Sequence, residues 1–212
     1  QTLFAEQISE IVTPDSSQEV IPAATMHRTL SAHQLLKPSS RLLYSLNAGR
    51  VDYEPYQFRP VLKLVQADRP RLLIADDVGV GKTIEAGFIL KELQARQELQ
   101  SVLVFCPKSL VTEDKWRSEL KRFSEDFINL DGPSLRQGIA DTFLDGQWPA
   151  RYRKVILPYS LLDEAAYFGS RKRKGLIDLD VWPKFDLVIV DEAHNIRNTE
   201  TWRYRIVKQF VD

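Results

Sequence analysis

Short apolar runs alternate with longer amphipathic segments between Pro60 and the end of the chain. The runs have the length of buried strands and lie at residues 71–75, 102–105, 155–157 and 187–190. Between them, residues 83–95 and 112–123 carry apolar side chains at helical spacing. Alternating strands and helices are typical of crossover units, so we predict an α/β fold whose mostly parallel sheet has helices on both faces.

Weaker patterns add further elements to this core. A helical stretch follows Pro60, residues 127–130 and 161–168 offer one more strand and one more helix, and residues 199–211 predict a final helix. We find no internal repeat.

The first part of the chain has a different character. Residues 1–24 are polar and irregular, and residues 31–46 show helical spacing that is interrupted at Pro38. We therefore expect residues 1–50 to form a partly helical N-terminal extension and residues 51–212 to form the α/β lobe.

A phosphate-binding loop follows the first predicted strand. Residues 76–83 read Asp-Asp-Val-Gly-Val-Gly-Lys-Thr, the spacing of a P-loop, and lead directly into the predicted helix. Its glycines let successive backbone N–H groups curl around a phosphate, and the helix N-terminus adds its positive dipole end. Lys82 would reach the β- and γ-phosphates as a catalytic residue, and the Thr83 hydroxyl would ligate magnesium. We expect the nucleotide to contact Asp77, Val78, Gly79, Val80, Gly81, Lys82 and Thr83.

The plain alternative is a glycine-containing turn in front of an ordinary helix. Asp76 stands where the P-loop usually has its first glycine, which weakens the bare pattern.

An acidic box follows the last predicted strand. Residues 191–194 read Asp-Glu-Ala-His, and carboxylates at the C-terminal end of a parallel strand lie where such sheets bind ligands. Asp191 would hold magnesium opposite Thr83, and Glu192 would orient or deprotonate the attacking water as a catalytic residue. The alternative is a helix N-terminus whose acids complement the helix dipole.

Composition limits the class of protein without naming it. Lys plus Arg equals Asp plus Glu at 29 each, so any nucleic-acid partner needs a local basic surface. A single cysteine and no apolar run of membrane-spanning length favour a cytoplasmic or nucleoid-associated protein with no membrane partner. Because the chain begins at Gln1 and its only methionine is Met26, we interpret it as part of a longer protein.

The phosphate-binding loop and the acidic box together resemble a known family. Residues 75–87 and 191–194 are similar to the Swi/Snf-like branch of the DEAD/DEAH-box helicase superfamily, and Ile84-Glu85-Ala86-Gly87 is most similar to the bacterial RapA-type ATPases. That branch normally has aspartate at the position of Asp76. The resemblance implies a RecA-like (P-loop NTPase) three-layer sandwich, ATP and Mg2+ as cofactors, and a coupling role for His194.

Three weaker motifs occur in the order that the resemblance implies. Gln57 would hydrogen-bond the adenine edge, Lys108 and Ser109 would make the first nucleic-acid contact, and Ser160 would lie near a phosphate backbone. Each has a plain alternative: a surface glutamine at a helix N-terminus, a cap on the helix after Pro107, or a polar residue at a strand end.

Two other features have no motif to explain them. The run Arg-Lys-Arg-Lys at residues 171–174, followed by Gly175, predicts an exposed loop, for which salt-dependent phosphate contact is the alternative use. The four tryptophans show no sign of base stacking and are expected in the core or at an interface: Trp116, Trp148, Trp182 and Trp202.

The resemblance also implies a missing partner. Related motors clamp ATP between two RecA-like lobes, and the second lobe supplies arginines that stabilise charge during phosphoryl transfer. After Asp191 this chain holds one predicted helix, no further strand and no Ser-Ala-Thr motif. We therefore expect an incomplete first lobe that binds ATP weakly and hydrolyses it poorly by itself.

The leading hypothesis is an ATP-dependent translocase that moves on double-stranded DNA or remodels protein–DNA complexes, with RNA as the alternative nucleic acid. A second hypothesis is a strand-separating helicase or the motor subunit of a restriction or phage-defence complex. A third is a non-hydrolysing adaptor whose N-terminal region docks a protein such as RNA polymerase. A small-molecule kinase would leave the acidic box unexplained.

Overall fold

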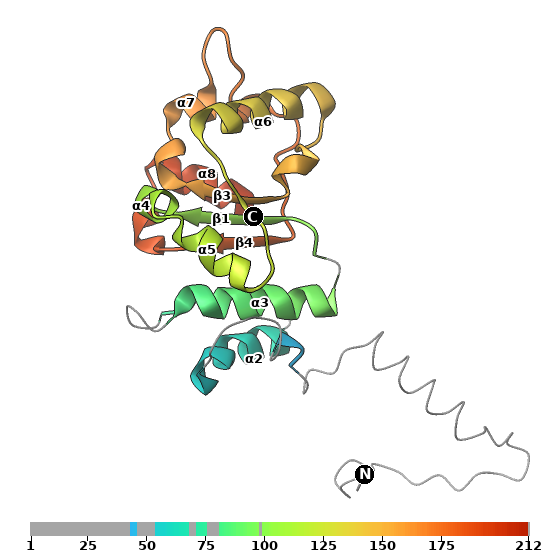
Figure 1. Cartoon of the computed structure of the whole chain (residues 1–212). Coiled ribbons are helices and arrows are strands. Elements are labelled where there is room, and N and C mark those ends of the chain that lie inside the picture. The colour runs from blue at the N-terminus through green and yellow to red at the C-terminus, as the bar shows by residue number, and fades with distance from the viewer. Residues whose placement is uncertain (1–42, 46–53, 68–70, 76–80, 98, 212) are drawn as a thin grey trace, which may run out of the picture. The chain divides into compact units, whose positions relative to one another are not determined.

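The computed structural model describes residues 43–45, 54–67, 71–75, 81–97 and 99–211 (Figure 1). All of them belong to one compact unit, residues 40–212. No helix within these described ranges is long and apolar enough to cross a membrane. Most of the expected N-terminal extension, and residues 76–80 of the phosphate loop, lie outside the described residues.

A four-stranded sheet forms the centre of the molecule. Its strands are β1 (Val102–Cys106), β2 (Ile128–Asn129), β3 (Lys154–Pro158) and β4 (Leu187–Val190), in the order β2-β3-β1-β4. Every pairing is parallel, with Val104 opposite Ile156 on one side and Ile189 on the other. The predicted parallel α/β fold is therefore confirmed, and three of the predicted strand positions agree with β1, β3 and β4.

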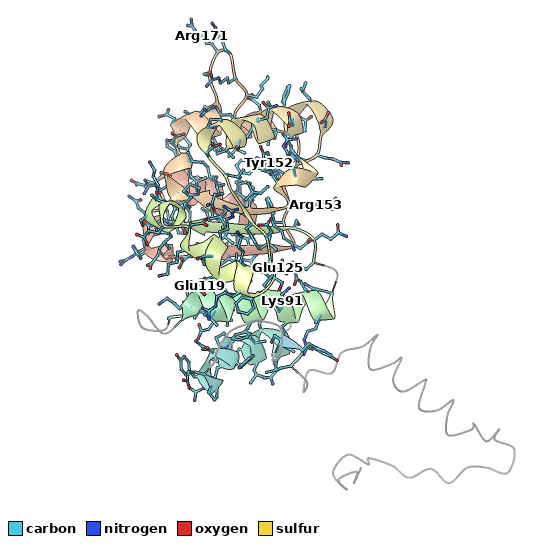
Figure 2. The ribbon with its side chains drawn as sticks, viewed as in Figure 1. Lys91, Glu119, Glu125, Tyr152, Arg153 and Arg171 are labelled. Carbon is cyan, nitrogen blue, oxygen red and sulfur yellow. The ribbon has the colours of Figure 1, made fainter. Side chains whose placement is uncertain are left out.

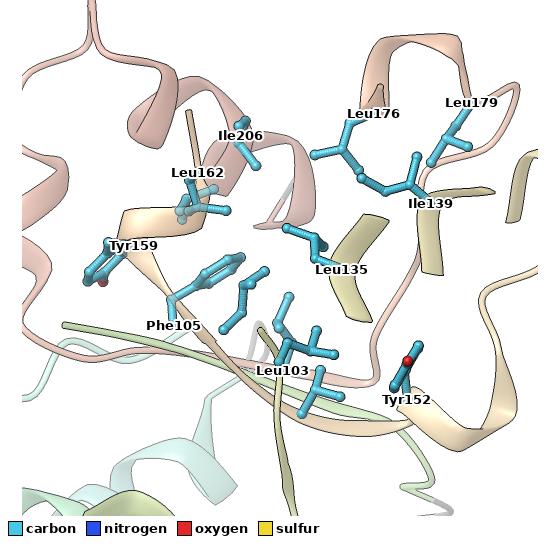
Figure 3. Packing of buried hydrophobic residues seen from close by; sticks show 14 residues of the cluster. Leu103, Phe105, Leu135, Ile139, Tyr152, Tyr159, Leu162, Leu176, Leu179 and Ile206 are labelled. Carbon is cyan, nitrogen blue, oxygen red and sulfur yellow. The ribbon is translucent and has the colours of Figure 1, made fainter. Parts of the chain in front are cut away.

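Helices cover both faces of the sheet because side chains alternate between faces along each strand. One face packs against α6 (Gly132–Asp145) and α8 (Trp202–Val211), and the other packs against α3 (Lys82–Arg96) and α5 (Lys115–Arg122). Figure 3 shows the first face, where Leu103 and Phe105 of β1 meet Leu135, Ile139 and Ile206. Each fully buried Leu, Ile or Phe contributes about 1.5–3 kcal/mol through the hydrophobic effect.

The helix that follows the phosphate loop is held on two sides. Besides facing the sheet, α3 packs against α2 (Arg59–Gln66), which lies beneath it in Figure 1. A Cβ atom on Gly87 would lie 2.3 Å from the Phe123 ring, so glycine is required where this ring crosses α3. Phe123 in turn packs edge-on against Phe88. The ring thus locks α3 to the end of α5.

A charged cluster ties α3 to the sheet. The buried Glu125 carboxylate pairs with Lys91 of α3 and with Lys154 of β3, the latter at 2.5 Å. Burial alone would raise the pKa of the Glu125 carboxyl, but hydrogen bonds and charge from Lys154 and Lys91 outweigh it and lower that pKa. The two ion pairs therefore join α3 and β3 through the ionised carboxylate of Glu125.

The prediction of a buried strand at residues 71–75 is wrong. These residues pair with no strand among those described, and Leu73 is 81% exposed. Leu72 and Ile74 pack instead against the α2–α3 cluster. An apolar run becomes a strand only where it pairs with a neighbouring strand, and residues 71–75 do not pair with β4, the edge strand of the described sheet.

Two helix predictions need correction as well. The helix expected at residues 112–123 begins only at Lys115, as α5, and a separate helix α4 (Lys108–Thr112) precedes it, because Asp114 adopts a left-handed backbone with φ 53°. Helix α6 was not predicted at all, although Asp131 caps it by accepting a hydrogen bond from Ser134 N and Gly146 ends it at φ 69°.

The remaining described elements are short turns of helix: η3 (Pro55–Phe58), η4 (Ala150–Tyr152), η5 (Tyr159–Leu161), α7 (Glu164–Phe168), η6 (Leu176–Asp178) and η7 (Ala193–Ile196). β2 and α7 lie within the weakly predicted segments 127–130 and 161–168, and α8 lies within the predicted final helix.

Candidate functional site

Three neighbouring strands end at one edge of the sheet. Cys106, the last residue of β1, lies opposite Pro158 of β3, and Phe105 lies opposite Val190 of β4. The polar segments singled out in the sequence follow these strands directly, and α3 begins on the same side of the molecule (Figure 1). The carboxyl edge of a parallel sheet is where α/β proteins bind ligands.

Asp191 is held in place by three surrounding segments. Its backbone N–H donates to Phe105 O at 2.9 Å, continuing the β1–β4 pairing by one residue. Nε1 of Trp116 donates to its Oδ2 at 2.7 Å, and Glu192 N donates to its Oδ1 at 2.9 Å. The Tyr159 hydroxyl donates to its carbonyl oxygen at 2.7 Å. Trp116 of α5 therefore fixes the orientation of the Asp191 carboxylate, and Tyr159 of η5 fixes the Asp191 backbone.

The site raises the pKa of two neighbouring groups. The Cys106 thiol has its pKa raised to about 12, first by burial and then by the negative charge of Asp191. Burial, with Asp191 as the next cause, also raises the pKa of the Tyr159 phenol well above its usual range. Both groups therefore stay protonated, and Tyr159 stays a hydrogen-bond donor.

Glu192 has a strained backbone. It is one of the few non-glycine residues described with positive φ, at φ 50° and ψ 49°. This conformation turns the chain out of β4 at once, and the Glu192 side chain is 44% exposed. Nδ1 of His194 lies 3.2 Å from its Oε2, and Asn195 Nδ2 lies 3.3 Å from His194 Nε2. Strained backbone of this kind concentrates at functional sites.

The described end of the predicted phosphate loop, Gly81, caps α3. Gly81 adopts φ 92° as the N-cap of α3, and its carbonyl accepts hydrogen bonds from Ile84 N and Glu85 N. Lys82 and Thr83 are half-buried in the first turn of the helix. Asp77, Val78, Gly79 and Val80, also predicted to bind nucleotide, lie outside the described residues.

Gln57 lies against Gly81, although the two residues are far apart in sequence. A Cβ atom on Gly81 would lie only 2.6 Å from Nε2 of Gln57, so no other residue fits Gly81 without moving the amide. Gln57 is buried, and its Oε1 accepts a hydrogen bond from Glu54 N at 3.1 Å. Gln57 is therefore not a surface side chain, but it does lie at a helix N-terminus, where this bond caps η3.

The predicted nucleic-acid residues form an exposed group at the same edge. Lys108 and Ser109 lie in α4 after β1, Ser160 lies in η5 after β3, and all three are exposed. They are neighbours because β1 and β3 pair directly. Their exposure leaves them accessible to a large ligand.

The residues present fit a magnesium ion of the kind that nucleotides carry. Within the described part of the chain no group of three His, Cys, Asp or Glu side chains could hold a metal. Mg2+ in phosphoryl-transfer sites usually takes one or two protein oxygens and completes its shell with phosphates and water. The Asp191 carboxylate and the Thr83 hydroxyl are donors of that type.

Sequence reasoning missed two residues of this site, Trp116 and Tyr159. Trp116 is only 3% exposed and was expected to be a core or interface residue, yet its N–H is bonded to Asp191. Tyr159 lies within the motif that singled out Ser160. A buried tryptophan usually donates its N–H to an acceptor. The presence of Trp116 therefore indicated a hydrogen-bond acceptor nearby, but not that the acceptor is Asp191.

Comparison with known proteins identifies the family. Residues 53–212 match the model of the SNF2-related domain, and the chain belongs to that family. The resemblance to the Swi/Snf-like branch is thereby confirmed.

Named relatives agree with this assignment. The chain is 31% identical over 157 residues to an "Uncharacterized ATP-dependent helicase YqhH" of Bacillus subtilis, covering 74% of this chain and 24% of that protein. It is 33% identical over 157 residues to the "RNA polymerase-associated protein RapA" of Sodalis glossinidius, covering 74% of this chain and 15% of that protein. The chain therefore spans about a quarter or less of these relatives' length.

A solved structure supports the fold. A Sulfolobus solfataricus SWI2/SNF2 ATPase core in complex with dsDNA aligns with a TM-score of 0.54 at 22% identity, covering 80% of this chain and 32% of that one. The RecA-like α/β fold of that core is thus shared.

Proposed function

We propose that this chain is the ATP-binding lobe of an ATP-dependent motor that moves on double-stranded DNA or remodels protein–DNA complexes. The observation that carries the proposal is the position of Asp191 and Glu192. They follow β4 at the carboxyl edge of the sheet, on the side where Gly81, Lys82 and Thr83 open α3 (Figure 1). Membership of the SNF2-related family supports the same assignment.

In this proposal the triphosphate of ATP lies over the N-terminus of α3. Residues 77–81 supply backbone N–H groups, and Lys82 supplies a positive charge to the β- and γ-phosphates. Thr83 and Asp191 would hold Mg2+, which when bound neutralises charge on the phosphate oxygens. Trp116 and Tyr159 keep Asp191 in position for this role.

Glu192 and His194 would carry the remaining steps. Glu192 is exposed, so its carboxylate can reach a water molecule in line with the γ-phosphate and orient it or accept its proton. His194 contacts Glu192 through Nδ1 and Asn195 through Nε2, and its side chain is 63% exposed. It is therefore placed to couple the nucleotide to a neighbouring group such as a second lobe.

Duplex DNA is the favoured partner. Lys108, Ser109 and Ser160 are exposed together at the edge that carries Asp191, and phosphate contacts of this type position a protein on nucleic acid. The structural relative was solved with dsDNA, and several sequence relatives are RNA polymerase-associated proteins by name. RNA polymerase is accordingly the protein partner that we propose.

The experiment joins this chain to a second RecA-like lobe and measures ATP hydrolysis with and without duplex DNA. We expect duplex to stimulate turnover, and Glu192→Gln to lower turnover roughly 10²-fold or more while ATP still binds. Turnover that ignores duplex, or that survives Glu192→Gln, contradicts the proposal. A strand-displacement assay in the same reaction separates a translocase from a strand-separating helicase.

A further inference from the structure

A basic hairpin rises from the lobe between α7 and η6. Residues 171–174 are Arg, Lys, Arg and Lys, and all four are exposed. The hairpin is closed by two backbone hydrogen bonds, Ser170 N to Arg173 O at 2.8 Å and Arg173 N to Ser170 O at 3.0 Å. Figure 1 shows this loop projecting beyond α6 and α7, and Figure 2 shows Arg171 at its far end. We call residues 170–175 the basic hairpin.

Two glycines at its base define how the basic hairpin leaves the lobe. Gly169 has φ 71° and ψ −145°, a conformation that is close to exclusive to glycine. A Cβ on Gly169 would lie 2.3 Å from Arg173 O, and a Cβ on Gly175 would lie 2.3 Å from Gly169 N. The two backbone segments at the base of the hairpin therefore approach each other at a distance that only glycine permits, and the loop between them is short.

Within the described part of the chain, no carboxylate forms an ion pair with the basic hairpin. None of its four cations lies within ion-pair distance of a carboxylate among residues 54–67, 71–75, 81–97 and 99–211. Lys174 lies over the Phe143 ring with Nζ 4.3 Å from its centre. The nearby carboxylates of Asp131 and Asp163 accept hydrogen bonds from Ser134 N and Ala166 N at the starts of α6 and α7. In a chain with no net charge, four exposed cations on one turn, without an ion-pair partner among the described residues, are a local concentration of charge that favours an external anion.

The basic hairpin is continuous with the edge of the candidate site. A cavity of about 180 Å³ at its foot is lined by Arg173 and Lys174, by Arg136 of α6, and by Leu161, the residue after Ser160. Asp163 is the one carboxylate in this lining, against three cations there, and Arg171 and Lys172 extend the positive charge to the hairpin tip. A surface of this form suits a line of phosphates rather than one isolated anion.

We propose that the basic hairpin is a second nucleic-acid contact, which grips the phosphate backbone of duplex DNA beyond the strand-end residues Lys108, Ser109 and Ser160. This inference rests on the proposed function for the identity of the partner. Because its side chains are long cations on a turn with no stacking residue, the contact is independent of base sequence. It adds affinity and register to the lobe without joining the chemistry of ATP hydrolysis.

The experiment measures binding of a fluorescent mixed-sequence DNA duplex by anisotropy, without nucleotide, between 50 and 200 mM salt. Arg171→Gln/Lys172→Gln is compared with Arg59→Gln/Lys63→Gln, a matched pair of exposed cations on α2 at the opposite end of the molecule. Arg171→Lys/Lys172→Arg keeps both charges and serves as the conservative variant.

We expect the hairpin variant to bind duplex several-fold more weakly at 50 mM salt, and the slope of log affinity against log salt to shrink by about 2, roughly 0.9 for each lost phosphate contact. The α2 variant and the charge-conserving variant should match the unmodified chain. Equal affinity and slope in the hairpin variant overturn the inference, as does loss of binding to a protein partner with DNA binding intact. Neither outcome bears on the proposed ATP site. That site is tested separately, by measuring nucleotide binding and its loss in Lys82→Ala.

Discussion

The indole N–H of Trp116 donates a hydrogen bond to Oδ2 of Asp191 at 2.7 Å, although 75 residues separate them. Trp116 comes from α5, the helix that follows the exposed pair Lys108 and Ser109. The backbone of Asp191 is bonded to Tyr159, the residue before Ser160. The two strand-end segments proposed to contact nucleic acid are thus followed or preceded by an aromatic residue that bonds Asp191: Trp116 bonds its carboxylate, and Tyr159 bonds its backbone carbonyl. Partners that orient a metal ligand tune the affinity of the metal.

Trp116→Phe keeps the ring and removes the N–H donor, so it tests this connection. We expect the affinity for Mg2+·ATP to fall about tenfold, because an outer partner of a metal ligand is lost. The free energy of unfolding should fall by about 1–2 kcal/mol. Isothermal titration and urea unfolding measure the two effects.

Trp148→Phe is the matched control, because Trp148 Nε1 donates to Tyr152 O at 2.9 Å on the other face of the sheet. It should lower stability by a similar amount and leave nucleotide affinity unchanged. If both variants bind Mg2+·ATP equally well, Trp116 has only a structural role.

Cys106 is predicted to be inert to thiol reagents while the chain is folded. Its pKa is raised to about 12 by burial and by Asp191, and only the thiolate reacts quickly. Since Cys106 is the only cysteine, labelling at pH 8 should follow the rate of unfolding and become rapid in denaturant. Fast labelling of the native chain would show that the end of β1 is open.

The same pKa shift predicts how stability changes in alkali. A folded-state pKa above the unfolded value means that the contribution to stability is full below the ordinary thiol pKa and is lost as pH rises toward 12. The free energy of unfolding should therefore decline above about pH 8.5. In Cys106→Ala this component of the decline should be absent. Identical pH profiles would contradict the shift.

Glu125→Gln should destabilise the fold at neutral pH by about 3 kcal/mol, because Lys91 and Lys154 lose a buried partner. The pKa of Glu125 is lowered in the folded state, so its contribution is present above the unfolded pKa and is lost as pH falls through the folded pKa. Chemical unfolding at a series of pH values should show the difference between the two proteins narrowing below about pH 4. A difference that stays constant into acid would exclude the ion pairs as its source.

The sequence was informative where local pattern and tertiary need agree. Buried strands such as residues 102–105 are apolar throughout because both faces of the sheet are covered, and Gly81 adopts the left-handed conformation that its motif requires. Residues 71–75 have the same apolar pattern but pair with no described strand, and periodicity carries no information about the availability of a neighbour. Helix α6 was missed although Leu135, Ile139 and Phe143 lie at helical spacing and its cap residues were visible.

The contacts of the candidate site were less predictable than its residue types. Motif spacing placed Asp191 and Ser160 at strand ends, which needs only the rule that parallel strands end together. The bond from Trp116 depends on the break at Asp114, which redirects α5. A left-handed backbone at a non-glycine residue is stabilised by tertiary contacts, so the local sequence did not indicate this conformation at Asp114.

The central claim is that Thr83 and Asp191 share one nucleotide-bound Mg2+. A double-mutant cycle tests it most directly, with Mg2+·ATP affinity measured by titration for the unmodified chain, Thr83→Val, Asp191→Asn and the double variant. If both groups hold the same ion, the second substitution costs little once the first is made, and the two effects fall short of additivity by about 1 kcal/mol or more. Effects that add to within about 0.5 kcal/mol would show that the two groups act at separate places.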